Sequence, residues 1–406
     1  IVLELVQLPQ DSRTSALQAE AFRLMSRAAE STSASDSSTW AMKTYTFDRA
    51  AGAFEQLGWE ELRLWNEYFV AHLVYYQMND RLSGIELARQ VQASARKAGV
   101  EVIEMVALQL EGAALLANSD GSQAELSAQD FNEAHRVFKL AAELAEDLGF
   151  QSEQALALFS DGTAWERQEN YTRALEQYRL ALGVAIEGGD TELANRIRND
   201  AAFAYETQGS IAGAIEMLDQ IGDQLSEKEA ARELAQSLYE KGRILNRHYR
   251  YREATDSLSE ALALTESADS EDLVAQTGFA LGSAYYQMGL MNKAAITLRE
   301  SMARVPASGH EKELWDALGM LAAIHRSQRD VDAMKSARQE QEAFVVNDRQ
   351  RAKLLFESAL DLIAFSGPEF AAAGSMLRKS RELSLSSGSP LLAHRALMTL
   401  CSEGTR

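Results

Sequence analysis

The sequence predicts an all-α protein, an α-solenoid of about nine antiparallel helix pairs. Three observations support this prediction. The chain of 406 residues contains only four prolines and little of the apolar–polar alternation that marks strands. A pattern of small, aromatic and alanine positions recurs every 40 residues along its middle part. Apolar residues make up 46% of the chain and charged residues 25%, so it can bury a core.

The repeat is clearest over residues 151–306, where four segments align on a central alanine. A small residue stands twelve positions before each alanine, and an aromatic residue or leucine stands nine positions before it. A large apolar residue stands four positions after it. The alanines are Ala174, Ala214, Ala254 and Ala294; the three accompanying sets are Gly162, Ala202, Gly242 and Gly282, then Trp165, Tyr205, Leu245 and Tyr285, then Tyr178, Leu218, Leu258 and Leu298. Antiparallel helices approach closely only where one presents Gly or Ala, and the large residue fills the neighbouring gap.

A short turn is expected between the two helices of each pair. The triplets QEN, QGS, HYR and MGL stand at this point in the four repeats. Gly209 and Gly289 are placed at the tightest position, where glycine adopts backbone angles that strain other residues.

The other elements follow in chain order. Residues 11–57 form one helix pair with a polar connector at 31–38, and the YYQM of 75–78 repeats that of 285–288. A helix around Gly112 is separated from its partner by an inserted polar loop at 118–129. Beyond the clear repeats, a pair is expected at 350–385 and a last helix after Pro390. The helical array thus covers 11–406. Residues 1–10 stand outside it: IVLELVQL alternates like a strand, either the remnant of a preceding domain or a frayed helix start.

These positions resemble the tetratricopeptide repeat (TPR). Its small residue, aromatic residue, turn glycine, alanine and following apolar residue fall on the positions above. The period differs, because it is 40 residues here and about 34 in the standard repeat. The resemblance implies a right-handed superhelix, and the longer period implies longer helices or longer loops between repeats.

A second resemblance is to bacterial proteins with a CHAT domain, a caspase-like peptidase fold. Some of these carry a small β domain, then a helix like SALQAEAFRLMSRAAE (15–30), then a long TPR array. The segment FEQLGWEELRLW (54–65) is similar to the first joint between repeats in that family. The resemblance implies that this chain is a sensing or regulatory arm, with any catalytic domain outside it.

Charge and composition exclude several classes of function. Lys and Arg number 40 against 60 Asp and Glu, a net charge of −20, whereas nucleic acids and anionic membranes require a basic face. No apolar run approaches the roughly 18 residues of a membrane span. Cys401 is the single cysteine, seven residues from His394, and the six histidines form no HxxH or HExxH cluster. We therefore expect no catalytic residues, no cofactor and no metal.

Binding along the first helices of the pairs is the better prospect. In TPR proteins the residues that line the groove face away from the second helix. Carried onto this register, they include Arg196, Asn199, Phe203, Tyr239, Arg243, Asn246, Arg247, Tyr286 and Arg326. Arg and Asn offer directed donors to a carboxylate or an acidic peptide, and the aromatic rings offer apolar anchors. In the alternative interpretation, the arginines pair with Glu of adjacent helices and the rings belong to the core between repeats.

The sequence therefore predicts a non-enzymatic scaffold whose partner is a protein or peptide. One hypothesis makes it the sensing arm of a larger protein such as a CHAT-type protease. The alternative is a TPR sensor that binds a short peptide or small ligand and controls a different output domain. The apolar last helix, PLLAHRALMTLC (390–401), is expected to dock against a missing domain or a second copy. The compartment stays open.

Overall fold

The structure is a computed structural model that describes residues 12–29, 37–117, 126–221, 229–265, 271–305, 309–365 and 370–403. The strand predicted within 1–10 lies outside these residues. The described parts contain nineteen helices and no strand. The helices are α1 (Ser12–Ala29), α2 (Ser37–Leu57), α3 (Glu60–Tyr76), α4 (Arg81–Ala98), α5 (Glu101–Leu116), α6 (Ala128–Asp147), α7 (Gln151–Arg167), α8 (Tyr171–Glu187), α9 (Thr191–Thr207), α10 (Ile211–Asp219), α11 (Glu229–Arg247), α12 (Tyr251–Thr265), α13 (Glu271–Gln287), α14 (Met291–Arg304), α15 (Glu311–Ser327), α16 (Val331–Glu342), α17 (Asp348–Phe365), α18 (Phe370–Ser386) and α19 (Pro390–Glu403).

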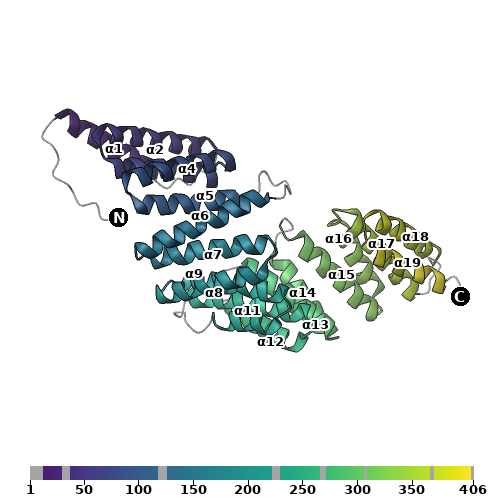
Figure 1. Ribbon diagram of the computed structural model, residues 1–406. Helices are drawn as coiled ribbons and strands as arrows, with labels where there is room; N and C mark the ends of the chain where they lie inside the picture. The colour runs from purple at the N-terminus through teal and green to yellow at the C-terminus, as the bar shows by residue number, and fades with distance from the viewer. Residues whose placement is uncertain are drawn as a thin grey trace. The chain divides into compact units, whose positions relative to one another are not determined.

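Helices that follow each other in the chain pack side by side, as Figure 1 shows. The predicted all-α array of about nine helix pairs is confirmed over the described residues, and α19 follows the ninth pair as a single helix against α18. The chain divides into two compact units, Ile1–Met217 and Leu218–Arg406. No helix in the described ranges is long and apolar enough to cross a bilayer.

The small residues of the repeat lie where the two helices of a pair approach most closely. A Cβ atom added to Gly162 would lie 2.5 Å from the Tyr178 ring, and one added to Gly282 would lie 2.6 Å from Leu298. Both separations are far below van der Waals contact. The predicted pairing of a small residue with a large apolar one across each helix pair is therefore confirmed at these positions.

The turns within pairs repeat every 40 residues. Gly209 and Gly289 have φ of 83° and 75°, as expected for the tightest point. The equivalent residues of three other pairs are not glycine, yet Glu169, Tyr249 and Arg329 have φ of 58°, 62° and 60°. The left-handed conformation costs such residues roughly 1–2 kcal/mol. It is retained because it lets the next backbone amide bond to the last turn of the preceding helix, as Asn170 N–H does to Trp165 at 2.9 Å, a Schellman-type closure.

An insertion interrupts the third pair. Gly112 of α5 opposes Phe138 of α6, 26 positions later, whereas Gly162 opposes Tyr178 only 16 positions later. The linker is therefore ten residues longer than in the clear repeats. Helix α6 begins at Ala128, just before the predicted end of the loop, because Ser127 caps it.

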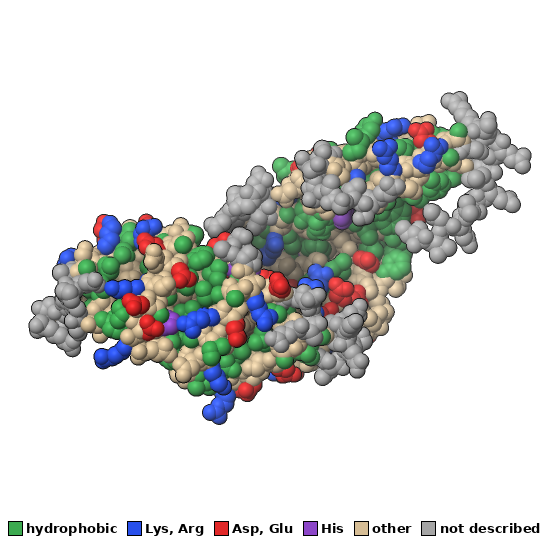
Figure 2. All heavy atoms as spheres, turned by 180° about the vertical axis from the view of Figure 1, so that it is seen from behind, with side chains coloured by type: hydrophobic (Ala, Val, Ile, Leu, Met, Phe, Trp, Pro, Cys, Tyr) green, Lys and Arg blue, Asp and Glu red, His purple; other side chains and the backbone are tan. Residues whose placement is uncertain are grey.

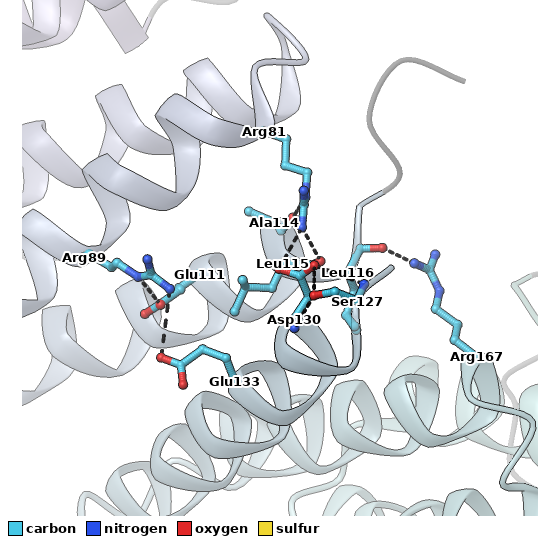
Figure 3. A network of polar contacts seen from close by, with 10 residues as sticks. All are labelled: Arg81, Arg89, Glu111, Ala114, Leu115, Leu116, Ser127, Asp130, Glu133 and Arg167. Carbon is cyan, nitrogen blue, oxygen red and sulfur yellow. Dashed lines mark hydrogen bonds and ion pairs between the residues drawn. The ribbon is translucent and has the colours of Figure 1, made fainter. Parts of the chain in front are cut away.

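Two arginines donate hydrogen bonds to the last carbonyls of α5 (Figure 3). Arg81 of α4 donates to the carbonyls of Ala114 at 2.9 Å and Leu115 at 3.0 Å. Arg167 of α7 donates to the carbonyl of Leu116. The last carbonyls of a helix lack partners within the helix, so these guanidinium groups stabilise its end.

Candidate functional site

The unit Leu218–Arg406 contains a cavity of about 1120 Å³. Its walls come mainly from the first helices of successive pairs, α11, α13, α15 and α17, and from α19. Stacking of the pairs places these helices next to one another in space, although they span some 150 residues of sequence. The volume is slightly above the range of about 300–1,000 Å³ that is typical of small-molecule sites, and it suits an extended ligand that contacts several helices.

Three of the predicted groove residues line this cavity. Tyr239 comes from α11, Tyr286 from α13 and Arg326 from α15. All three are half-buried. Burial raises the pKa of the Tyr239 hydroxyl, so this ring presents a neutral phenol.

The other predicted residues of this unit do not line the cavity. Arg243 is exposed and pairs with Glu240 on its own helix at 2.9 Å. The amide of Asn246 donates to the carbonyl of Ala280 at 2.9 Å and so joins α11 to α13. Arg247, at the end of α11, is exposed. For Arg243, the structure agrees with the alternative interpretation that the arginines pair with Glu.

The remaining predicted residues belong to the unit Ile1–Met217. The Arg196 guanidinium lies over the Phe159 ring, 5.5 Å from its centroid. Phe203 is 44% exposed and meets Tyr171 edge-on. Asn199 is half-buried, and its side-chain oxygen has no hydrogen-bond partner among the described residues. The predicted stripe is thus divided between two units.

A carboxyl pair lies beside these residues. Burial and, to a smaller extent, the nearby Glu166 carboxylate raise the pKa of Asp200 to about 6. Burial also raises the pKa of Glu166, which accepts a hydrogen bond from the Tyr178 hydroxyl at 2.8 Å. Over the described residues, no three His, Cys, Asp or Glu side chains are grouped as metal ligands would be.

Two buried aromatic residues of the cavity wall were not predicted from the sequence. Trp315 of α15 and Phe356 of α17 line it and are both only 4% exposed. Each ring carries a cation: the Lys353 ammonium lies 4.5 Å from the Trp315 centroid, and the Arg395 guanidinium lies 5.0 Å from that of Phe356. Apolar surface and positive charge therefore adjoin each other in the cavity.

A buried ionic network forms part of the wall. The Asp361 carboxylate, in a residue only 2% exposed, accepts from Arg338 at 2.8 Å and from Arg326 at 2.9 Å. Arg338 also donates to Glu357 at 2.7 Å and Gln341 at 2.8 Å. The network links α15, α16 and α17 by charge-assisted hydrogen bonds.

The position of Arg338 in the 40-residue repeat is the feature of the sequence that indicates this network. Arg338 stands 40 residues after Leu298, in the slot that large apolar side chains fill in the clear repeats. In the same pair, His325 occupies the aromatic slot; it is buried and its Nε2 lies 2.9 Å from Arg299. Burial and Arg299 lower the pKa of His325, so the ring is neutral and accepts this hydrogen bond. Polar residues in slots that are otherwise apolar mark α15 and α16 as unlike the pairs before them.

The cavity differs in charge from the whole chain. Six Lys and Arg side chains line it against three carboxylates, in a chain of net charge −20. On the face shown in Figure 2, acidic, basic and apolar side chains are interspersed rather than gathered by sign. The local excess of cations in the cavity therefore does not follow from the composition.

Comparisons with known proteins place the fold. No protein-family model matches the sequence, and neither does any curated protein. Among solved structures, the apo form of RapI is 15% identical, with a TM-score of 0.52, over 81% of this chain and 97% of that one. The apo form of the quorum sensor NprR from B. thuringiensis is 12% identical, with a TM-score of 0.50, over 92% and 99%.

A third structure names the repeat. It is a Signal Transduction ATPase with Numerous Domains (STAND) from Pyrococcus horikoshii with a tetratricopeptide repeat sensor. It is 13% identical, with a TM-score of 0.52, and the match covers 89% of this chain and 56% of that one. At these identities the similarities show the fold alone. The chain therefore has the tetratricopeptide-repeat fold.

Proposed function

We propose that this chain is a non-enzymatic module that binds a peptide or an extended protein segment in the cavity of the unit Leu218–Arg406. The observation that carries this proposal is the cavity itself, which α11, α13, α15, α17 and α19 line together. A ligand that crosses several helices must be extended, and a peptide meets this requirement. The cavity presents half-buried aromatic rings as apolar anchors and guanidinium groups as directed donors.

A steric block tests the proposal. Ala323 lines the cavity, and Ala323→Trp would fill part of it without changing any charge. Ser336 on α16 is exposed and lies outside the cavity lining, so Ser336→Trp is the matched control. The two variants and the unaltered protein would each be incubated with a library of short random peptides, and the bound fraction sequenced.

We expect the unaltered protein and Ser336→Trp to enrich the same peptides, and Ala323→Trp to lose them. Equal enrichment by Ala323→Trp would place peptide binding outside this cavity. Circular dichroism of all three proteins checks that the helices are retained.

We further propose that the module serves as the sensor of a larger protein. Two output domains remain as hypotheses. A CHAT-type protease is suggested by the layout of the sequence around 54–65, and a different signalling domain is suggested by the similarity to the STAND protein with its tetratricopeptide repeat sensor. Peptide-bond cleavage by the full-length protein, measured with and without an enriched peptide, distinguishes them: stimulated cleavage supports the first, and its absence excludes it.

A further inference from the structure

We infer that the occupant of this cavity is an acidic peptide segment that carries a bulky apolar side chain next to its carboxylates. This inference rests on the proposed function and specifies the chemistry of its ligand. Charge, aromatic surface and their proximity in the cavity support it together.

The first observation is a set of cations without carboxylate partners. Lys312, Arg349 and Arg395 line the cavity and are exposed, and none forms an ion pair with an Asp or Glu of the described chain. They come from α15, α17 and α19, three different helices. Their unpaired state leaves three positive charges available to a ligand.

The other cations of the lining are less available. Arg326 and Arg338 are held by Asp361, and Arg338 also by Glu357, so two carboxylates balance their two charges inside the wall. Lys353 lies 3.7 Å from Asp316, near the limit of an ion pair. The surplus of charge is therefore due to the unpaired cations, and the buried network serves to keep the wall in place.

The second observation is the position of the apolar surface. The Arg395 guanidinium lies directly over Phe356, and Lys353 lies over Trp315. These two rings are almost fully buried, so the apolar surface that a ligand can touch comes from Leu391, which is 73% exposed and one turn before Arg395 on α19, and from the half-buried Tyr239 and Tyr286. A carboxylate beside an aromatic or leucine side chain can meet both the cations and this surface, whereas a purely anionic ligand would leave the apolar surface without contact.

The charge of the whole chain limits the kind of anion. Glu313 and Asp316 also line the cavity, and the net charge is −20. At physiological salt the Debye length is about 8 Å, so distant carboxylates are screened while the adjacent cations still act. A short acidic segment fits within this range. A long polyanion such as a nucleic acid would extend beyond it into acidic surface.

The test uses four fluorescent peptides of one length with the full chain. The first contains Asp and Glu next to Phe and Leu; the second replaces the acids by Asn and Gln; the third replaces them by Lys; and the fourth keeps the acids but replaces Phe and Leu by Ala. Affinities are measured by fluorescence anisotropy. We expect the first peptide to bind at least about tenfold more tightly than each of the others. The net charge by itself would favour the basic peptide, so preference for the acidic one must arise locally.

A charge-reversal pair assigns that preference to the cavity. Arg349→Glu and Arg351→Glu change the net charge equally and lie two residues apart on α17, but only Arg349 lines the cavity. We expect Arg349→Glu to weaken binding of the first peptide about tenfold and Arg351→Glu to change it less than about twofold. Equal weakening by both variants would overturn the assignment to the cavity.

The outcomes separate this inference from the function on which it rests. Equal binding of the acidic and amide peptides, or tighter binding of the basic one, overturns the acidic ligand. If the random library is nevertheless enriched and Ala323→Trp abolishes the enrichment, the proposed peptide-binding function stands. If neither the library nor the four peptides bind, both proposals fail.

Discussion

Asp361→Asn tests whether the buried network holds the ninth helix pair to the eighth. The carboxylate of Asp361 accepts from two guanidinium groups, at 2.8 and 2.9 Å, in a residue only 2% exposed. Asparagine has nearly the same shape but is neutral, and its NH₂ group would face a guanidinium donor. Removing one partner of a buried ion pair costs about 3–5 kcal/mol. Domain stabilities are roughly 5–15 kcal/mol, so the unit Leu218–Arg406 should unfold at clearly lower urea concentration.

The assay is urea unfolding followed by circular dichroism. Glu240→Gln is the control, because Glu240 pairs with Arg243 at the same kind of distance but at the surface. Exposed pairs contribute about 0–1 kcal/mol, so the control should shift the midpoint little. Comparable losses in the two variants would refute the idea that burial of Asp361 makes its pairing important.

A double substitution sharpens the test. Arg338→Leu with Asp361→Leu replaces the pair by apolar side chains, and leucine already fills the equivalent slot at Leu298. Such replacements of buried ion pairs are often neutral or stabilising. The double variant should therefore be more stable than Asp361→Asn. If both are equally unstable, the loss reflects altered packing rather than unpaired charge.

Three further predictions concern other parts of the chain. Arg329→Gly should raise the stability of its unit by about 1 kcal/mol, because φ of 60° strains arginine, whereas Gly209→Ala should lower stability by a similar amount. The midpoints of urea unfolding measure both changes, and opposite signs would contradict the argument from the turns. The pKa of Asp200 is raised from 3.8 to about 6, so ionisation of this carboxyl destabilises the fold increasingly between pH 3.8 and about 6, by up to about 3 kcal/mol. Asp200→Asn should therefore raise the free energy of unfolding at pH 7 and change it little at pH 3.5. An equal gain in stability at both pH values would exclude the carboxylate as its cause. Arg243→Glu should change the affinity for an acidic peptide by less than about twofold, since Arg243 lies outside the cavity lining. A loss of affinity as large as that of Arg349→Glu would favour the groove predicted from the sequence over the cavity as the binding site.

Much of the fold could be predicted because its determinants are local and periodic. The spacing from Gly162 to Tyr178 specified a close helix approach, and the structure shows that contact. The left-handed residue at Gly209 followed from the same register. The non-glycine turns, such as Tyr249, were less evident, since their conformation is imposed by the helices on either side rather than by the residue.

The site was predicted only in part. Tyr239, Tyr286 and Arg326 line the cavity, but Arg243, four residues after Tyr239 on α11, does not. Residues four apart lie on the same face of a helix, so Arg243 differs from Tyr239 in its position along α11, one turn nearer the end of the helix, and the repeat register does not show how far along a helix a cavity extends. Ion pairing adds a second uncertainty, because the partner of a long side chain depends on what lies within its reach.

The sequence by itself determined the class of protein: helix pairs with a 40-residue period, close contacts at small residues, and turns at fixed positions. Each of these depends on neighbours within one or two helices. The tertiary structure decided which charges meet. Lys312, Arg349 and Arg395 are 83 residues apart from first to last, yet they line one cavity because α15, α17 and α19 contribute to the same wall. Which cations remain unpaired there depends on the packing of several helices, and no local pattern in the chain records it.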